Sequence, residues 1–537
     1  MKYIFVSGGV ISGIGKGIAT ASMAMLLKSA GFKVVPIKFD PYLNIDAGTM
    51  NPIEHGEVFV LDDGAETDQD LGHYERFLNE SLNKHSIATQ GSIYWTVLQK
   101  ERNLEYGGTN VDVVTHITEE ILRRIDLVAK DKDVDVVFIE IGGTAGEYQN
   151  MLFLEANRLL KIRKPDDVIH VHITYLPIPH SIGEMKSKPA QMSVRDLNAV
   201  GIQPDIILAR AERSLDSSRI KKLAMSTGLE PEDIISAPDV TNIYEVPLNF
   251  EEQGLTNRIL KKLRLKRKSQ ALSEWRGFVS KVNKSQKQEK TIKIGIVGKY
   301  FATGDFTLAD AYISVIEAIK HASFSLGFKP EIAWLDAGKV LAEVDLLKGY
   351  QGIIVPGGFG SRDIEGKIAT IKYCRENKIP YLGLCYGMQM ASIEFARNVL
   401  GLTGANTTEV NSTTKCPVIH IMPDQEKKLL KKDYGATMRL GAWDCVLKKD
   451  TLTQKLYAKN ETSERHRHRY EFNNEYRAQY EAAGFVFSGT SPDGKLVEII
   501  ELPGHPFFIG TQFHPELKSR PLSPHPLFVG FIKAAAR

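Results

Sequence analysis

Two successive series of short strands and amphipathic helices constrain the fold of this chain more than any other feature. In the first series, runs rich in β-branched residues recur up to about residue 265, and stretches with helical periodicity separate them. The strand-like runs are Tyr3–Ser7, Lys33–Lys38, Val134–Glu140, Val168–Thr174 and Asp205–Ala209, and the helical stretches include Gly15–Ala30 and Thr118–Ala129. This alternation predicts a parallel sheet with helices on both faces.

A second series of the same kind begins at Ile292 and extends to Arg537. Its strand-like runs are Ile292–Val297, Glu331–Leu335, Gly352–Val355, Tyr381–Leu384, Val418–Met422, Leu496–Leu502 and Phe508–Phe513, with helical stretches at Ala309–Leu326 and Ile364–Asn377. We therefore expect an α/β protein with one parallel-sheet domain over residues 1–265 and a second α/β domain over residues 292–537.

The segment between the two series, residues 266–291, is basic, polar and poor in large apolar residues. Twelve of the 68 Lys and Arg residues lie from Lys261 to Lys293, against two acids, so the rest of the chain is net acidic. We interpret this segment as a solvated linker with one helical piece that docks through Trp275 and Phe278; binding of a polyanion is the alternative. No nucleic-acid-binding face is expected elsewhere.

The remaining composition argues for a cytoplasmic protein with no membrane partner. No apolar run approaches the 18 or so residues that a membrane helix needs, and the first residues read as a strand rather than a secretory signal. The four cysteines, Cys374, Cys385, Cys416 and Cys445, show no Cys-x-x-Cys spacing and are too few for a disulfide framework.

A glycine-rich run, Ser7–Gly17, follows the first strand and opens a helix. Backbone N–H groups of such a loop approach phosphate oxygens closely, the helix N-terminus adds positive potential, and Lys16 can reach the terminal phosphates. The run departs from the usual phosphate-loop pattern, because Gly17 stands where Ser or Thr would bind magnesium. The alternative interpretation is a glycine-rich strand–helix turn without a ligand.

Magnesium would then need carboxylates from elsewhere in the first domain. Glu140 ends an apolar strand, where a Walker B acid lies, and Asp70 belongs to an acid-rich stretch. Taken alone, either residue is more often a solvated loop acid than a metal ligand. Lys38 ends the second strand, at the sheet edge where ligands gather, and the lysines of Lys186–Gln191 could hold a second polyphosphate or lie in a surface loop.

The second domain carries the pattern of an activated cysteine. Cys385 lies between a strand and a helix with Gly383 and Gly387 beside it, as in a nucleophile elbow, and a helix N-terminus favours the thiolate. His514 and Glu516, two residues apart, could serve as base and orienting acid. The backbone of Val355–Gly360, with the N–H of Tyr386, could form an oxyanion hole. A buried structural cysteine with an unrelated histidine is the alternative.

Taken together, the motifs closely resemble those of the CTP synthase family, a phosphate-loop amidoligase fused to a class I glutamine amidotransferase. The resemblance covers nearly the whole chain. It rests on Ser7–Gly17, Lys38–Asn44, Gly48–Met50, His55–Val60, Asp63–Phe77, Glu140–Thr144, Pro356–Phe359, Gly383–Gln389, Arg465–Tyr470 and His514–Glu516.

The resemblance implies a role for each matching residue. Cys385, His514 and Glu516 would be catalytic, and the glutamine-binding positions would be Gly358, Tyr386, Gly387, Met388, Gln389, Glu409 and Arg469. ATP would lie on Gly13, Ile14, Gly15, Lys16, Gly17, Ile18, Asp70 and Val240, and magnesium on Asp70 and Glu140. UTP or CTP would contact Ser12, Glu147, Tyr148, Gln149, Lys186, Ser187, Lys188, Pro189, Ala190, Gln191 and Lys222.

The implied reaction is ATP-dependent amination of UTP to CTP through a 4-phosphorylated UTP, with ammonia taken from L-glutamine or from solution. The resemblance also implies Mg²⁺ as cofactor, GTP as allosteric activator, inhibition by the product, and a homotetramer that can extend into filaments. Three departures from the family pattern stand out. Tyr386 replaces a leucine, Glu147-Tyr148-Gln149 replaces Asp-Ile-Glu at the CTP site, and Ser187 and Ala190 replace threonines.

Two other functions remain as alternatives at this point. A ligase that aminates a carboxylate would use the same phosphate loop and would be indifferent to UTP. A nucleotide-regulated assembly protein with vestigial sites would polymerise without hydrolysing glutamine, although the intact set of Cys385, His514 and Glu516 argues against it.

Overall fold

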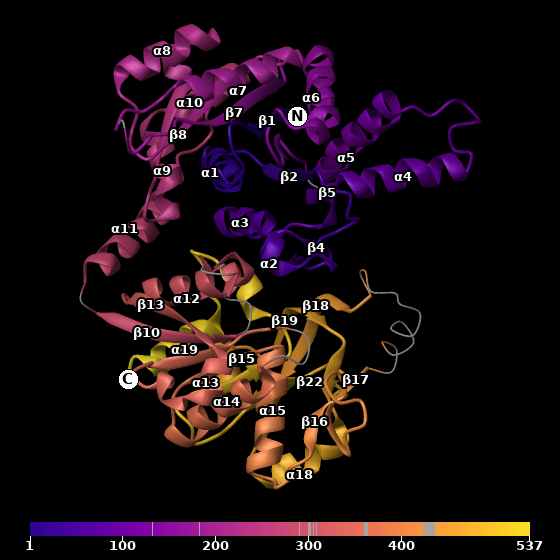
Figure 1. The fold of residues 1–537 in the computed structure, drawn as a ribbon, viewed down its shortest axis with the longest axis vertical. Coiled ribbons are helices and arrows are strands. Elements are labelled where there is room, and N and C mark those ends of the chain that lie inside the picture. Colours follow the sequence, from indigo (N-terminus) through magenta and orange to yellow (C-terminus); the bar gives the residue numbers. More distant parts are fainter. Residues whose placement is uncertain are drawn as a thin grey trace. The chain divides into compact units, whose positions relative to one another are not determined.

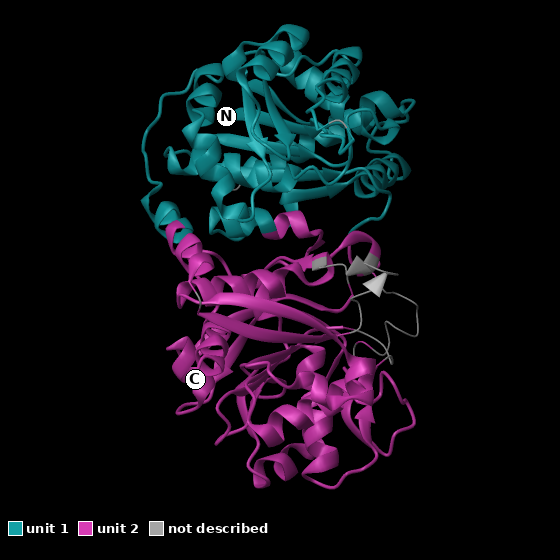
Figure 2. Ribbon diagram, turned by 60° about the vertical axis from the view of Figure 1, so that its left-hand side comes forward, with its two compact units in different colours: residues 1–46, 73–279 teal, residues 47–72, 280–537 magenta. Residues whose placement is uncertain are grey.

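The computed structural model describes residues 1–130, 133–181, 183–288, 290–298, 302–303, 306–307, 309–358, 363–422, 425, 435 and 437–537. The chain forms two compact units: residues 1–46 with 73–279, and residues 47–72 with 280–537 (Figure 2). The domain boundaries expected from the sequence stay a prediction, and the segment 47–72 packs with the C-terminal half. Within the ranges described, each helix is too short or too polar to cross a bilayer.

The first unit is built on a seven-stranded sheet in the order β5-β2-β6-β1-β7-β8-β9 (Figure 1). Every neighbouring pair is parallel, which confirms the expected architecture. The strands are β1 (Lys2–Gly8), β2 (Val34–Asp40), β5 (Ile87–Thr89), β6 (Val136–Ile141), β7 (Val168–Tyr175), β8 (Ile206–Ala211) and β9 (Ile234–Pro238). Strands buried on both faces read as continuous apolar runs, and β6 is buried along its whole length.

Helices connect these parallel strands. They are α1 (Lys16–Ser29), α4 (Gln90–Arg102), α5 (Thr118–Lys130), α6 (Met151–Arg163), α7 (Lys188–Ala199) and α8 (Ser217–Thr227). Two more helices, α9 (Val246–Glu252) and α10 (Leu255–Lys262), follow the last strand of the chain in this sheet, β9. Strand β1 lies between β6 and β7, whereas β2 lies beyond β6. The loop after β1 therefore opens where the direction of the strand order changes, which is where such sheets bind ligands.

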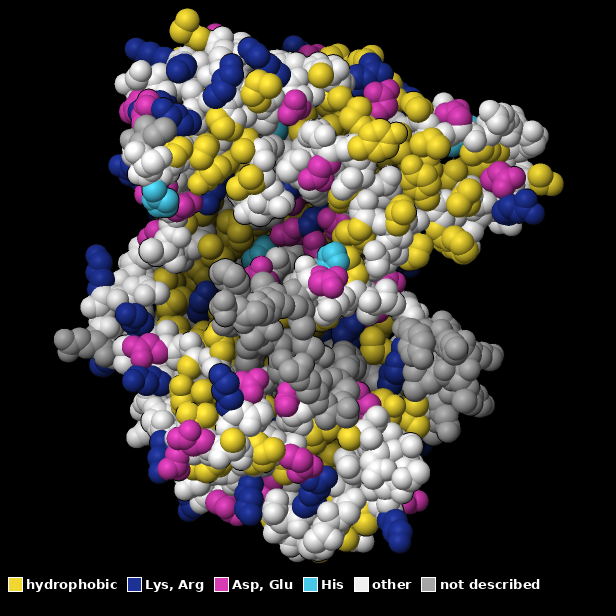
Figure 3. All heavy atoms as spheres, in the orientation of Figure 1, with side chains coloured by type: hydrophobic (Ala, Val, Ile, Leu, Met, Phe, Trp, Pro, Cys, Tyr) yellow, Lys and Arg dark blue, Asp and Glu magenta, His cyan; other side chains and the backbone are white. Residues whose placement is uncertain are grey.

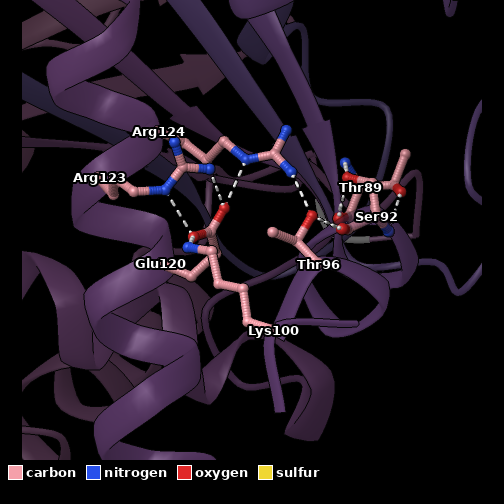
Figure 4. Close-up of polar contacts among 7 residues, drawn as sticks. All are labelled: Thr89, Ser92, Thr96, Lys100, Glu120, Arg123 and Arg124. Carbon is pink, nitrogen blue, oxygen red and sulfur yellow. Dashed lines mark hydrogen bonds and ion pairs between the residues drawn. The ribbon is translucent and has the colours of Figure 1, made fainter. Parts of the chain in front are cut away.

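A buried carboxylate ties α5 to α4 (Figure 4). Glu120 is 3% exposed and accepts hydrogen bonds from Arg123, from Arg124 Nε at 2.8 Å and from Lys100 Nζ at 3.1 Å. Arg124 also donates to Thr96 Oγ1 at 2.8 Å. Burial alone would raise the pKa of Glu120, but the hydrogen bonds from these three cations lower it to about 2.

Two aromatic side chains dock the helix that leaves the first unit, as expected from the linker sequence. Helix α11 (Ser273–Lys287) begins in residues of the first unit, and Trp275 and Phe278 are both buried there. The Trp275 indole donates to the Tyr244 carbonyl at 2.9 Å, and its ring lies 5.1 Å from that of Phe77. The predicted docking of a helical piece through these two residues is confirmed.

The second unit contains a nine-stranded sheet in the order β13-β10-β14-β15-β23-β22-β21-β18-β19 (Figure 1). Its first five strands are parallel and the last four pair antiparallel. The strands are β10 (Thr291–Gly298), β13 (Lys329–Asp336), β14 (Gly352–Val355), β15 (Tyr381–Leu384), β18 (Arg439–Leu447), β19 (Glu461–His468), β21 (Val486–Thr490), β22 (Val497–Glu501) and β23 (Phe508–Thr511).

Smaller sheets accompany this main sheet. Their strands are β3 (Phe59–Val60) with β4 (Glu66–Thr67), β11 (Ala302–Thr303) with β12 (Phe306–Thr307), and β16 (Ala405–Thr407), β17 (Cys416–Ile421) and β20 (Tyr470–Phe472). The expected strand at Val418–Met422 therefore belongs to the three-stranded sheet. Helix α3 (Gln69–Leu78) follows β4 along the chain.

Helices cover both faces of the main sheet of the second unit. One buried cluster joins Val297 to α13 (Ala337–Ala342), α14 (Ile364–Asn377) and α15 (Tyr386–Asn398). The opposite cluster joins Ile294 to α12 (Ile313–Ser325) and α19 (Pro526–Ala535). Among the described residues of this unit, further helices are α2 (Pro52–His55), α17 (Leu452–Tyr457) and α18 (Arg477–Ala482).

Candidate active sites

The glycine-rich loop after β1 has the geometry of a phosphate cradle. Gly13 and Gly15 take positive φ angles of 71° and 81°, and α1 starts directly after Gly15. These left-handed angles strain any residue with a side chain, so glycine is required here. Lys16 curls back over the loop, and its Nζ donates to the Gly143 carbonyl at 2.6 Å. The loop thus presents backbone donors and one lysine at the start of a helix.

A cavity of about 470 Å³ extends from this loop. Gly13, Gly15, Ile18 and Val240 all line it, so the structure brings the expected adenine position to the loop, while Ile14, Lys16 and Gly17 belong to the same turn. Sequence reasoning missed Arg210, which also lines the cavity and donates to Asp239 Oδ1 at 2.7 Å. The position of Arg210 at the carboxyl end of β8, where ligands bind in such sheets, could have indicated this residue.

The two expected magnesium ligands lie in different compact units. Glu140 is almost completely buried, faces Val6 and Lys38 in the strand register, and accepts a hydrogen bond from the Tyr74 hydroxyl at 2.5 Å. Asp70 lies in the first turn of α3, where its backbone N–H donates to Asp68 Oδ1 at 3.0 Å. The described residues hold no cluster of three metal-ligating side chains. One or two carboxylates with phosphate oxygens would suit Mg²⁺, and the Glu140 carboxylate fits that requirement.

Basic side chains gather at the start of α7, as expected for a polyphosphate site. Lys186 and Arg219 lie 2.6 and 3.6 Å from the carboxylate of Glu184, and these two cations with Lys222 lower the pKa of Glu184. Arg219 was missed by the sequence interpretation. The other expected positions of this stretch are Ser187, Lys188, Pro189, Ala190 and Gln191, which form the cap and first turn of α7.

The expected CTP-site residues lie in the loop after β6. Thr144 Oγ1 donates to Glu147 Oε1 at 3.1 Å, and Gln149 Nε2 donates to Glu147 Oε2 at 3.4 Å. Tyr148 is 93% exposed, and Ser12 is exposed on the glycine-rich loop. These residues are available for a ligand.

The nucleophile candidate of the second unit occupies a strained turn. Cys385, between β15 and α15, has φ of 49° and ψ of −96°, and its N–H donates to the Thr511 carbonyl at 2.6 Å. A Cβ at Gly387 would lie 2.1 Å from the Val355 carbonyl oxygen, and one at Gly383 would lie 2.8 Å from the Gly387 carbonyl carbon. Glycine is therefore needed on both sides of the elbow, as the sequence predicted.

His514 and Glu516 form a buried pair beside this turn. His514 Nδ1 lies 2.7 Å from Glu516 Oε1, and its Nε2 has no hydrogen-bond partner in the described part of the chain. Burial alone would lower the pKa of His514, but the charges of Glu516 and Cys385 raise it to about 10. The imidazole is thus oriented by its carboxylate and is stabilised as a cation.

One cavity of about 640 Å³ joins these three residues to the expected glutamine-binding positions. Cys385, His514 and Glu516 line it together with Gly358, Glu409 and Arg469. The Arg469 guanidinium donates hydrogen bonds to Gln425 Oε1 at 2.8 Å and to Thr437 Oγ1 at 2.9 Å, which fix its orientation. Gly357 also lines the cavity, whereas Phe359 and Gly360 of the expected oxyanion loop lie outside the described residues.

The first turn of α15 supports the site from behind. Tyr386, Gly387, Met388 and Gln389 are buried and do not line the cavity with their side chains. The Lys367 ammonium lies 4.7 Å from the centroid of the Tyr386 ring. The Tyr386 side chain therefore packs into the protein, where it leaves the cavity unobstructed.

A segment from the start of the chain completes the wall of this cavity, which sequence reasoning missed. Gly48, Thr49, Met50, Pro52, Glu57 and Val58 line it together with Cys385. Two arginines on the same face of β19 hold the segment: Arg465 Nε lies 2.7 Å from Asp62 Oδ1, and Arg467 Nε lies 2.7 Å from Glu66 Oε1. Arg467 also donates to the Gly48 carbonyl at 3.0 Å.

Comparison with known proteins gives a consistent result over the whole chain. Residues 2–265 match the family model described as CTP synthase N-terminus, and residues 307–534 match that of class I glutamine amidotransferases. The chain is 50% identical to a CTP synthase of Halalkalibacterium halodurans, covering 100% of this chain and 99% of the relative. It is 52% identical to a CTP synthase of Caldanaerobacter subterraneus (99% and 98%) and 49% identical to that of Bacillus subtilis (99% and 98%).

Among solved structures, the glutaminase domain of a Trypanosoma brucei CTPS with bound acivicin is 37% identical. That match covers 46% of this chain and 94% of the solved chain, with a TM-score of 0.42.

Proposed function

Because this chain belongs to the CTP synthase family, we propose that its two candidate sites divide the family reaction between them. The protein is a glutamine-hydrolysing ligase that converts UTP to CTP in pyrimidine biosynthesis. Cys385, His514 and Glu516 release ammonia from glutamine, and the site at the glycine-rich loop uses that ammonia to aminate UTP. The observation that carries this assignment is the single cavity shared by Cys385, the His514–Glu516 pair and Arg469.

The geometry of the cysteine site supports the following route for glutamine hydrolysis. The Cys385 thiolate attacks the side-chain carbonyl carbon, and the negative oxygen that forms is stabilised by backbone N–H groups at Gly358 and Tyr386. His514 gives a proton to the leaving nitrogen, so that ammonia departs and a glutamyl thioester remains. Water then cleaves the thioester and regenerates the thiol. Glu409 and Arg469 hold the charged amino-acid end of the substrate.

Amination of UTP takes place in the first unit. Gly13, Ile14, Gly15, Lys16, Gly17 and Ile18 hold the ATP phosphates, and Val240 contacts adenine. The γ-phosphoryl group passes to O4 of UTP, and ammonia then displaces phosphate at C4, because phosphate is a far better leaving group than the original oxygen. Asp70 and Glu140 would hold Mg²⁺, which neutralises the charge on the phosphates. Lys186 and Lys222 bind the UTP phosphates.

Enclosure explains why both half-reactions belong to one chain. Ammonia released into water at neutral pH becomes ammonium and loses the lone pair that it needs for attack. Gly48, Met50 and Val58 line one wall of the Cys385 cavity. A protein that keeps ammonia enclosed uses one glutamine for each CTP.

Self-association into a homotetramer, which can extend into filaments, is the assembly that we infer. Support comes from the apolar surface of the first unit around α4, where Trp95, Leu98, Leu104, Val113 and Val114 are all at least half exposed (Figure 3). An apolar area of this kind marks an interaction surface.

The four cysteines are free thiols, consistent with a cytoplasmic location.

Regulation by nucleotides belongs to the same proposal. GTP activates glutamine use, and CTP competes at the UTP site. Gln149 stands where relatives carry an acid, and the lost charge is expected to change the strength of product inhibition.

The decisive experiment compares two nitrogen sources. Purified protein with UTP, ATP and Mg²⁺ should form CTP with glutamine or with ammonium chloride. Cys385→Ala should lose the glutamine reaction and keep the ammonia reaction, since only the nitrogen source is removed. Loss of both reactions in that variant would show that the roles are wrongly assigned, and phosphate release with a carboxylate but not with UTP would favour the other ligase class.

A further inference from the structure

A buried amide lies beside the nucleophile without a role in the mechanism described above. Gln512, which follows β23, is 1% exposed, and its side-chain Nε2 lies 3.6 Å from Cys385 Sγ. The Gln512 backbone N–H donates to the Glu498 carbonyl at 2.8 Å, so the residue is fixed to the sheet. The side chain therefore contacts the reacting sulfur from a rigid position.

The surrounding hydrogen bonds determine which end of this amide faces the sulfur. Gln389 Nε2 donates to the Tyr470 carbonyl at 2.9 Å, and a carbonyl accepts only from an NH₂ group. The same Nε2 donates to Gln512 Oε1 at 3.3 Å. Because Gln512 uses its oxygen to accept this bond, its NH₂ group is the end that points at Sγ.

Protonated and ionised cysteine use different partners at this site. A thiol can donate to the Arg467 carbonyl, which lies 3.9 Å from Sγ, whereas a thiolate can only accept. Gln512 offers the thiolate a donor. The titratable and charged groups that line the same cavity are Glu57, Glu409, Arg467, Arg469, Tyr470, Tyr312, His514 and Glu516. Gln512 adds to these an uncharged donor in direct contact with the sulfur.

We propose that Gln512 is a positioning residue for glutamine hydrolysis, whose side-chain NH₂ donates to Cys385 Sγ, favours the thiolate and directs it toward the substrate amide. Gln389 holds Gln512 in the required orientation. In this step the thiol proton passes to His514 and the electron pair stays on sulfur, ready to form the bond to the glutamine carbonyl carbon. This inference rests on the proposed function of the cysteine site.

Two substitutions of similar size distinguish the contribution of the Gln512 hydrogen-bond donor from the contribution of its packing. Gln512→Glu replaces the NH₂ by an acceptor that repels a thiolate, and Gln512→Met removes the donor while filling the space. Loss of one hydrogen bond to a charged group predicts a fall in kcat for glutamine hydrolysis of about 10- to 100-fold for Gln512→Met, and a larger fall for Gln512→Glu. KM should change little, because Gln512 does not line the substrate cavity.

Ser488→Ala is the matched control, because it removes another buried side-chain hydrogen bond, which joins β21 of the same sheet to Thr453 of α17 at 3.2 Å. This variant should leave glutamine hydrolysis unchanged. Alkylation of Cys385 by iodoacetamide, followed over pH, provides a second readout. Both Gln512 variants should reach half-maximal alkylation at a higher pH than the parent protein.

The outcomes are distinct. Variants within twofold of the parent in kcat and in alkylation would overturn the inference, and so would an equal loss of the ammonia-dependent reaction, which would indicate general damage. If the parent protein itself forms no CTP from ammonia or glutamine, the proposed function fails instead.

Discussion

The strongest electrostatic prediction concerns Glu516→Gln, which keeps the shape of the side chain and removes its charge. Glu516 accepts from His514 Nδ1 at 2.7 Å, and both residues are largely buried. In the parent protein the pKa of His514 is raised to about 10 against the opposing effect of burial. In the variant the attractive charge of Glu516 is gone, while burial still disfavours the imidazolium. Both effects lower the pKa of His514, which should fall by several units.

The magnitude follows from that shift. A rise from 6.5 to about 10 corresponds to about 5 kcal/mol of preferential stabilisation of the imidazolium, shared between Glu516 and Cys385. His514 keeps its proton up to about pH 10 in the parent protein and should lose it at a much lower pH in the variant. The acid that protonates the leaving nitrogen is then scarce at pH 8, and a general acid contributes about 10²- to 10⁴-fold to the rate.

The assay is the pH profile of kcat/KM for glutamine hydrolysis, with ammonia-dependent CTP formation as the control for folding. We expect the alkaline limb to move to lower pH and the rate at pH 8 to fall by at least about 100-fold, while the ammonia reaction is unchanged. An alkaline limb that stays in place would refute the reasoning, because it would mean that Glu516 does not stabilise the His514 cation.

Three further perturbations test other parts of the structure. Lys16→Ala should abolish CTP formation with glutamine and with ammonia, measured side by side, because both routes need phosphorylated UTP; normal turnover would contradict the phosphate-cradle role. Arg467→Gln should raise the number of glutamine molecules consumed per CTP above one, since the ion pair with Glu66 that holds the cavity wall is lost. The control variant Arg477→Gln should leave this ratio at one. A ratio of one in both variants would disprove the role of the Arg467–Glu66 ion pair. Glu120→Gln should lower the free energy of unfolding in urea at pH 7 by at most about 3 kcal/mol, because the pKa of Glu120 is lowered to about 2. The difference in unfolding free energy between Glu120→Gln and the parent protein should disappear as pH falls from about 4.5 toward 2. Glu119→Gln, at an exposed neighbouring position, should lower the free energy of unfolding far less. Equal losses of stability in the two variants would disprove the role of burial.

Strands and local turns were the predictable part of the fold. The expected strands Gly352–Val355 and Tyr381–Leu384 coincide with β14 and β15, and Lys33–Lys38 differs from β2 by one or two residues at its ends. Strand β19 was not predicted, because its alternating arginines and histidines carry none of the apolar pattern that marks a strand. Those polar side chains are buried because each face of β19 finds partners from distant segments: Arg465 pairs with Asp62, and His466 Nε2 lies 3.7 Å from Glu498 Oε2.

The sequence alone indicated the two α/β halves, the glycine-rich loop and the candidate residues Cys385, His514 and Glu516, since each of these signals depends on a short local motif whose spacing is fixed by the chain. Only the tertiary structure decided that Gly48–Val58 forms a wall of the Cys385 cavity and that the amide of Gln512 faces the sulfur. Contacts between residues hundreds of positions apart arise from packing of whole segments, and no local pattern records them.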